Sequence, residues 1–164
     1  SLLPLVTEYT NLVILRSLTK FYSLPGLRIG YAIAHPDRVQ QWQGWRDPWA
    51  VNSLAEVAGI AALHDLTFQQ QTLQWLPSAR QALRDGLNIP PLRVFPAAAN
   101  YMLVKSKFSA TRLQRQLLEA DRILIRDCES FPELGDRFFR VAVRSPEENQ
   151  RLIDAVQRIL ATMG

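Results

Sequence analysis

A lysine near two hydroxyl side chains is the part of the sequence best suited to covalent chemistry. Lys20 ends the polar stretch Ser-Leu-Thr-Lys at 17–20, and Arg28 follows eight residues later. A lysine fixed and partly desolvated at the end of a strand is favoured for Schiff-base chemistry. The hydroxyls of Ser17 and Thr19 and the guanidinium of Arg28 could converge on a phosphate. Each residue taken alone is more simply a solvated loop side chain, so the prediction rests on their combined spacing.

Two arginines later in the chain are candidates for binding an anionic substrate. Arg126 and Arg140 fall on neighbouring predicted strands, and guanidinium groups bind carboxylate and phosphate through paired hydrogen bonds. A small molecule that carries both groups needs two separate cationic clamps, which these two residues could supply. Arginines at strand ends are also common surface charges. The excess of arginine, 16 of 19 basic residues at a net charge of +4, fits anionic ligands, nucleic acid or a GC-rich genome equally.

The elements that must position these residues alternate between apolar runs and helical patterns. The run at 11–16 has the pattern of a buried parallel strand, and the pattern at 65–87 is helical with an interruption at Pro77. Ser145, Pro146 and Glu148 form the start of the last helix as N-cap, first residue and third residue. We expect strands at 11–16, 27–34, 92–95, 101–104, 122–126 and 138–143, and helices at 36–45, 52–63, 65–87, 109–120 and 146–161.

The lysine stretch and the run Pro-Gly-Leu-Arg-Ile-Gly-Tyr at 25–31 together resemble the fold-type I pyridoxal-phosphate enzymes, in the histidinol-phosphate aminotransferase-like branch. In that family the S-x-[ST]-K lysine is bound covalently to the cofactor, pyridoxal 5'-phosphate, and the arginine eight residues later binds the cofactor phosphate. The resemblance implies that Lys20 is the Schiff-base lysine and the catalytic general acid and base. It also implies that Ser17 and Arg28 are phosphate ligands, with Thr19 as a further cofactor-binding residue.

The fold that this resemblance implies is α/β, the C-terminal part of a fold-type I PLP-dependent transferase, with a remnant of the large-domain sheet and a small α+β domain. Residues 1–50 would be the C-terminal segment of the large cofactor-binding domain, 51–86 the linking helices, and 87–164 the small C-terminal domain. Family members place about half of the chain before the lysine, including the carboxylate that faces the pyridine nitrogen. We therefore expect this chain to be the C-terminal portion of a longer homodimeric enzyme, and inactive alone.

Two further stretches resemble motifs of the same family that bind substrate. The stretch at 96–101 resembles the A-N-[FY] strand, which implies that Asn100 contacts the substrate. Arg140 resembles the late arginine that binds the substrate α-carboxylate, and the stretch at 47–52 resembles the P-[aromatic]-x-[VI]-N entry to the linking helices. The resemblance therefore extends over essentially the whole chain.

A finer resemblance concerns the run Ile-Leu-Ile-Arg-Asp-Cys-Glu-Ser-Phe at 123–131. This run is similar to that of the threonine-phosphate decarboxylases of cobalamin biosynthesis, which implies a PLP-dependent lyase that converts O-phospho-L-threonine to (R)-1-amino-2-propanol O-phosphate. In that case Arg126 binds the phosphate of the substrate. A class I/II histidinol-phosphate aminotransferase is the alternative, because those enzymes carry an arginine near this place too. An inactive fragment or an anion-binding module is the second alternative.

Composition argues against several other classes of protein. The sequence has two distant histidines and one cysteine, Cys128, so we expect no metal site and no internal disulfide. No apolar run approaches the roughly 20 residues of a membrane helix, and the first residues lack the features of a signal peptide. No nucleic-acid-binding motif is present. We expect a cytoplasmic enzyme whose partner is a small phosphorylated amino acid, with neither nucleic acid nor membrane as a partner.

Overall fold

The computed structural model describes residues 2–162 and divides the chain into two compact units. The first unit extends to Phe68 and the second begins at Gln69. The helix α4 (Leu66–Leu87) starts in the first unit and continues in the second. Within the described residues, none of the helices is both long enough and apolar enough to cross a membrane.

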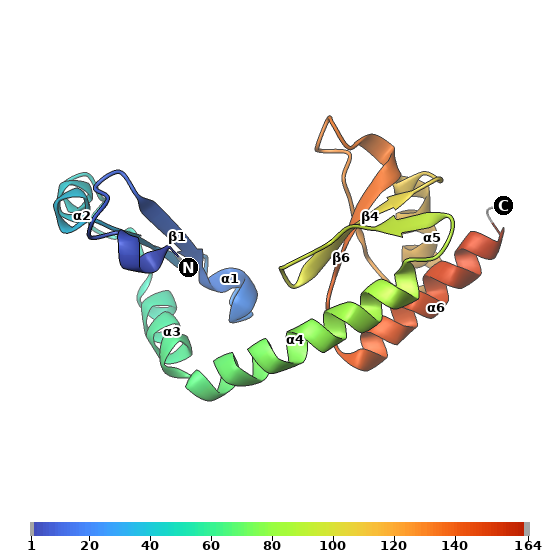
Figure 1. Cartoon of the computed structure of the whole chain (residues 1–164), viewed down its shortest axis with the longest axis horizontal. Coiled ribbons are helices and arrows are strands. Elements are labelled where there is room, and N and C mark those ends of the chain that lie inside the picture. Colours follow the sequence, from blue (N-terminus) through green and yellow to red (C-terminus); the bar gives the residue numbers. More distant parts are fainter. Residues whose placement is uncertain (1, 163–164) are drawn as a thin grey trace. The chain divides into compact units, whose positions relative to one another are not determined.

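The first unit contains a two-stranded sheet with short helices around it (Figure 1). Strand β1 (Val13–Ser17) pairs antiparallel with β2 (Gly30–Ala34), so that Ser17 lies opposite Gly30. The connection between the strands holds the one-turn helix α1 (Leu18–Phe21). The other elements of this unit are the 3-10 helix η1 (Leu3–Leu5), α2 (Pro36–Gln43) and α3 (Ser53–His64).

The prediction of a buried parallel strand at 11–16 is wrong in two respects. Strand β1 is antiparallel to its neighbour, and most of its side chains are exposed, with Leu15 at 77%. An apolar β-branched run marks a strand that can be covered, but its direction depends on the partner strand. Here the chain reverses after α1, and a short reversal of this kind produces an antiparallel pair.

Helix starts in the first unit follow the local sequence closely. Pro36 opens α2, and the Asn52 side chain caps α3 by accepting a hydrogen bond from the Ala55 amide at 2.8 Å.

The predicted interruption at Pro77 is wrong, because α4 passes through this proline as one helix. A proline removes one backbone hydrogen bond, and the burial of Leu83 and Leu87 further along the same helix offsets that loss.

The second unit contains a four-stranded antiparallel sheet and the helices that pack on it. Its elements after α4 are β3 (Leu92–Val94), β4 (Tyr101–Ser106), α5 (Ala110–Asp121), β5 (Arg126–Asp127), η2 (Gly135–Arg137), β6 (Phe138–Ala142) and α6 (Pro146–Thr162). The strand order in the sheet is β3-β4-β6-β5.

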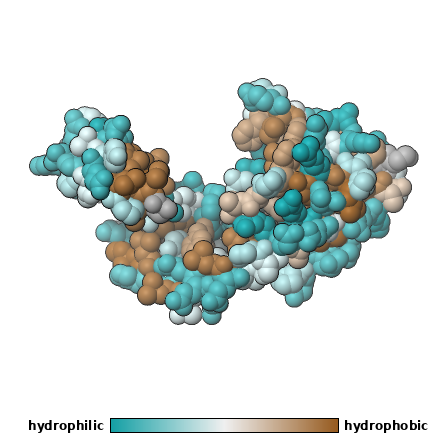
Figure 2. Space-filling model, viewed as in Figure 1, coloured by the Kyte–Doolittle hydropathy of each residue, from teal (hydrophilic) through white to brown (hydrophobic). Residues whose placement is uncertain are grey.

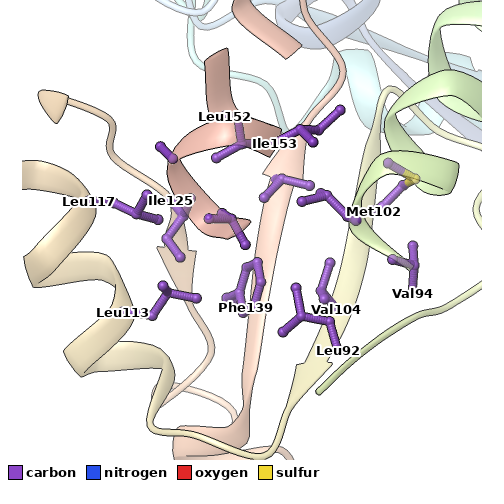
Figure 3. Packing of buried hydrophobic residues seen from close by; sticks show 14 of the residues in the cluster. Leu92, Val94, Met102, Val104, Leu113, Leu117, Ile125, Phe139, Leu152 and Ile153 are labelled. Carbon is purple, nitrogen blue, oxygen red and sulfur yellow. The ribbon is translucent and has the colours of Figure 1, made fainter. Parts of the chain in front are cut away.

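One face of the sheet packs against α5, α6 and the C-terminal part of α4, and Phe139 is fully buried in that core. Figure 3 shows Phe139 with Leu113 and Leu117 of α5 on one side and Leu92 and Val104 of the sheet on the other.

The predicted strand at 122–126 is much shorter in the structure. Arg122 adopts a left-handed conformation with φ of 57° and ends α5, where its amide donates to the Leu118 carbonyl. The Ile123 amide donates back to Leu117, so residues 123–125 leave the helix without joining the sheet ladder. Ile125 is buried in the core, which explains why an apolar pattern continues through this connection.

The start of α6 confirms the predicted capping arrangement. The Glu148 amide donates to the Ser145 hydroxyl, and the Glu148 carboxylate accepts from the Ser145 amide. Leu152, Val156 and Ile159 of this helix are buried. They fix α6 against the sheet that carries the two candidate substrate arginines.

Exposed apolar side chains are concentrated in the first unit, and Figure 2 shows them as brown patches on its surface. On α3 the side chains of Leu54, Val57 and Ile60 are 77%, 69% and 52% exposed. Trp49, just before this helix, is 92% exposed. This unit therefore buries little of its own apolar surface.

Candidate active site

The structure joins Ser17, Thr19 and Lys20 in one chain of hydrogen bonds at the junction of β1 and α1. The Lys20 Nζ donates to the Thr19 Oγ1 at 3.0 Å, and the Thr19 Oγ1 lies 2.8 Å from the Ser17 Oγ. Ser17 is the N-cap of α1, and its Oγ accepts from the Thr19 amide at 3.3 Å. Thr19 is 6% exposed, so its hydroxyl is the fixed centre of the cluster.

Lys20 is fixed but not desolvated, which corrects part of the prediction. Its ammonium is held by Thr19, whereas the residue as a whole is exposed. The reason is local: Leu18 and Thr19 turn into the core of the unit, and the next residue of a single helical turn then faces outward. Within this unit the Lys20 ammonium donates to the Thr19 hydroxyl, which in turn lies 2.8 Å from the Ser17 hydroxyl.

The backbone of Arg28 lies next to this cluster, whereas its guanidinium points to another partner. The Leu18 amide donates to the Ile29 carbonyl at 3.2 Å, which brings the turn before β2 beside the start of α1. The Arg28 guanidinium donates to the Pro25 carbonyl at 2.9 Å. Among the described residues, no hydrogen bond links it to the hydroxyls or to Lys20. Its φ of 51° is a left-handed conformation that costs a non-glycine residue about 1–2 kcal/mol.

The donor set of the first unit fits pyridoxal 5'-phosphate. The Lys20 ammonium is hydrogen-bonded to the Thr19 hydroxyl, and that hydroxyl lies within hydrogen-bond distance of the Ser17 hydroxyl. Together they offer a nucleophilic amine and phosphate donors at the same strand end. Arg28 completes this set only if its guanidinium leaves the Pro25 carbonyl. These are the residues of this chain that could hold the cofactor.

In the second unit the structure places Arg126 and Arg140 directly opposite each other. They are register partners in the antiparallel pair of β5 and β6, which separates their backbones by about 5 Å. Like charges directly opposite one another destabilise a sheet. Among the described residues, neither guanidinium takes part in an ion pair. A bound anion would therefore stabilise this pair of positive charges.

The surroundings of the two arginines differ. The Arg140 guanidinium lies over the Tyr101 ring at 5.1 Å, and its buried Nε has no hydrogen-bond partner within the described part of the chain. Arg126 is exposed, and its Nη2 donates to the Ser130 hydroxyl at 3.1 Å. A buried guanidinium N–H without an acceptor costs free energy, so the orphaned donor of Arg140 is the strongest sign of a missing acceptor.

Cys128 lies beside this pair and is fully buried. Burial raises the pKa of the Cys128 thiol; Arg140 and Arg126 oppose that effect, and Asp127 adds to it. The net result is a raised pKa, so the thiol is protonated at neutral pH and is a poor nucleophile. The structure gives this cysteine a packing role.

Asn100 precedes β4 in the loop that connects it to β3. Its carbonyl accepts from the Val143 amide at 2.8 Å, which ties the loop to the end of β6.

Tyr101 and Ser130 are contacts of the arginines that sequence reasoning did not assign. Alternation along the predicted strand could have placed Tyr101 beside Arg140 only if the register of the two strands had been known.

The candidate residues thus form two groups that lie in different units. Ser17, Thr19 and Lys20 are brought together in the first unit, with Arg28 close by along the backbone only. Arg126 and Arg140 are brought together in the second unit, and Asn100 is tied to the end of β6. In the described residues, no group of three or more His, Cys, Asp or Glu could hold a metal ion.

Known proteins match almost the whole chain. The family model "Aminotransferase class I and II" matches residues 1–156. Threonine-phosphate decarboxylase from Salmonella typhimurium is 41% identical over 160 residues, which cover 96% of this chain and 44% of that protein. The chain therefore spans less than half the length of this curated relative.

Solved structures match with the same coverage. L-threonine-O-3-phosphate decarboxylase from Porphyromonas gingivalis is 31% identical with a TM-score of 0.84, over 95% of this chain and 49% of that one. The histidinol-phosphate aminotransferase from Clostridium acetobutylicum is also 31% identical, with a TM-score of 0.87, over 97% of this chain and 48% of that one.

Proposed function

Because the chain belongs to the class I and II aminotransferase family, we propose that it forms the substrate-binding and lysine-bearing part of a PLP-dependent decarboxylase. It has the mixed α/β fold of the C-terminal half of fold-type I PLP enzymes. The reaction proposed is the conversion of O-phospho-L-threonine to (R)-1-amino-2-propanol O-phosphate, a step of cobalamin biosynthesis. The full-length protein would carry out this reaction as a cytoplasmic homodimer.

The cross-strand pair of arginines is the observation that carries this proposal. O-phospho-L-threonine has a carboxylate and a phosphate on one small molecule, and Arg126 and Arg140 are register partners across β5 and β6. Among the described residues, neither guanidinium takes part in an ion pair. A substrate with a single anionic group would leave one of two like charges uncompensated. The similarity to the decarboxylase from Salmonella typhimurium supports the same substrate.

We assign the two anionic groups from the surroundings of each arginine. Arg140 is partly enclosed and stacked on Tyr101, which suits a planar carboxylate bound in one fixed orientation. Arg126 is exposed and has the Ser130 hydroxyl beside it, so a tetrahedral phosphate would find a cation and an additional donor there. Asn100, tied to the end of β6, is the third proposed substrate contact.

The cofactor would be held by the first unit. When bound, pyridoxal 5'-phosphate supplies an electron sink for the charge left as a bond to the substrate α-carbon breaks. Lys20 would hold the cofactor covalently and, after carbon dioxide has left, donate a proton from its Nζ to the α-carbon, with Thr19 fixing that nitrogen. The Ser17 hydroxyl and the Arg28 guanidinium would bind the cofactor phosphate.

The same proposal assigns the parts of the chain to domains. Residues 1–50 would complete the large cofactor-binding domain, residues 51–86 would link the domains, and residues 87–164 would form the small domain that carries the substrate arginines. The exposed apolar side chains of α3 fit a segment that is covered in the full-length protein.

A histidinol-phosphate aminotransferase is the second candidate, favoured by the match to the Clostridium acetobutylicum structure. Histidinol phosphate carries a phosphate but no carboxylate. In that reaction Arg126 would bind the phosphate, and Arg140 would be used only when the 2-oxo acid that accepts the amino group is bound. The two candidates therefore require the two arginines at different times.

The test is carbon dioxide release by the full-length protein with pyridoxal 5'-phosphate and O-phospho-L-threonine. Release that is lost in Arg126→Ala and in Arg140→Ala supports the decarboxylase. Amino transfer from histidinol phosphate to a 2-oxo acid, without carbon dioxide release, replaces it with the aminotransferase. L-Threonine serves as the matched substrate control, because it keeps the carboxylate and lacks the phosphate.

A further inference from the structure

We propose that Arg80, on α4, is a positioning residue for the loop that carries Asn100. The Asn100 loop is defined here as residues 95–100, between β3 and β4. Arg80 itself touches no candidate substrate group, so its role would be indirect. The functional consequence rests on the proposed function, in which Asn100 contacts the substrate, whereas the structural effect can be tested without it.

Arg80 holds the Asn100 loop through backbone carbonyls. Its Nη1 donates to the Ala98 carbonyl at 3.0 Å and to the Ala99 carbonyl at 3.4 Å. Residues 97–99 are all alanine, so this part of the loop has no polar side chain with which to fix itself. A backbone carbonyl that lacks a partner in a loop is free to rotate with its peptide plane. The guanidinium therefore supplies a constraint that the loop sequence does not contain.

The loop is also held from the sheet, which makes the Arg80 contacts effective. The Val143 amide donates to the Asn100 carbonyl at 2.8 Å, and the Phe95 amide donates to the Leu103 carbonyl at 3.0 Å. With Arg80 on the helix side, the loop has anchors on both sides. The residue that follows the loop is Tyr101, whose ring supports the Arg140 guanidinium. A displacement of the loop would thus reach both Asn100 and the ring under Arg140.

A matched control lies one turn further along the same helix. Arg84 has the same charge and a similar intermediate burial, and among the described residues it makes no hydrogen bond or ion pair through its side chain. Arg84→Ala therefore removes an equal charge from α4 without touching the Asn100 loop. Arg80→Lys keeps the charge of Arg80 but replaces the planar guanidinium with a single ammonium group, which reaches fewer acceptors.

The first experiment measures amide hydrogen exchange in the chain as it exists, with the Val143 amide as the reporter. Loss of a charged donor is expected to raise the Val143 exchange rate roughly tenfold in Arg80→Ala, with a smaller rise in Arg80→Lys. The β4–β6 ladder amides should stay within about twofold, and Arg84→Ala should match the parent chain throughout. An unchanged Val143 rate, or an equal rise over the whole sheet, would overturn the positioning role.

The second experiment measures steady-state kinetics of the full-length enzyme. We expect Arg80→Ala to raise KM for the carboxylate substrate about tenfold while kcat changes much less, because the loop acts on substrate binding. Arg80→Lys should recover part of this loss, and Arg84→Ala should not differ from the parent enzyme. An increased Val143 exchange rate with an unaltered KM would refute the link from the loop to the substrate. Absence of both proposed activities would count against the proposed function, and the exchange data would then decide the role of Arg80 alone.

Discussion

The contact between α4 and α6 gives a sharp prediction at Gly86. A methyl group added at this position would lie 2.8 Å from the Ile153 Cγ1, closer still to its Cδ1, and 3.2 Å from its Cγ2. Real Cβ atoms do not approach other carbons so closely, so the isoleucine or the helix would have to move. The Gln157 side chain also donates to the Gly86 carbonyl at 3.3 Å, which confirms that the two helices approach closely here.

Two opposing effects determine the stability of Gly86→Ala. Alanine is favoured over glycine in a helix interior by up to about 1 kcal/mol. Overpacking of a well-filled contact costs about 1–3 kcal/mol. Three side-chain atoms of Ile153 are involved, so the steric cost should be the larger. We expect a net loss of about 0.5–2 kcal/mol, and each kcal/mol lowers the Tm of a unit of this size by about 4–8 °C.

A double-mutant cycle with Ile153→Val tests the cause of this loss. Valine lacks the Cδ1 atom that lies nearest to the added methyl group, and this change alone should cost about 0.5–1.5 kcal/mol. The double variant should lose less stability than the two single variants combined, with a coupling of at least about 0.5 kcal/mol. Thermal unfolding followed by circular dichroism measures all four proteins. A Gly86→Ala chain that is more stable than its parent would refute the reasoning.

The other predictions concern the proposed site and its support. In the full-length enzyme with pyridoxal 5'-phosphate, Lys20→Ala should abolish the covalent adduct that borohydride traps, and mass spectrometry that finds an adduct on another lysine would exclude Lys20 as the attachment site. Arg140→Ala should weaken binding of every α-carboxylate ligand, and Arg126→Ala only that of phosphorylated ligands, each by about tenfold or more; equal losses for both ligand types would contradict this division. Burial alone would raise the pKa of Asp136, but hydrogen bonds from the start of α5, including the Thr111 amide and hydroxyl, lower it overall. A carboxyl whose pKa is lower in the folded than in the unfolded chain stabilises the folded state at pH values above its unfolded pKa. This contribution should therefore be present at neutral pH and should fall as the pH drops below about 4. Unfolding midpoints at pH 7 and pH 3 should therefore differ less in Asp136→Asn than in the parent chain, and an equal pH dependence would argue against it.

Local chemistry made much of the fold predictable from the sequence. The cap at Ser145 was predictable because it acts within three residues, and the observed caps at Asn52 and Ser109 act over the same short distance. The hydroxyl and ammonium chain at 17–20 is equally local, because its members are separated by one or two residues. Predictions of this kind do not depend on the rest of the molecule.

Features that depend on distant parts of the chain were harder to predict from the sequence. The direction of β1 depends on β2, and the length of β5 depends on how the chain leaves α5 after Arg122. Arg126 and Arg140 were expected on two neighbouring strands. The register that makes the two arginines direct partners cannot be predicted from the sequence of either strand alone. The orientation of the Arg28 guanidinium toward Pro25 is a side-chain choice that no sequence pattern specifies.

Because Cys128 is buried, the reactivity of its thiol can report local opening of the chain around β5 and β6. The sequence contains a single cysteine, and it lies with no exposed surface immediately after β5. A thiol reagent can reach it only when the chain around β5 and β6 opens, so the labelling rate counts those openings without any introduced probe. Because Arg126 and Arg140 lie on the same two strands, a bound anion that bridges them should slow the labelling. Thiol labelling thus offers a way to detect occupancy of the arginine pair in the absence of catalysis.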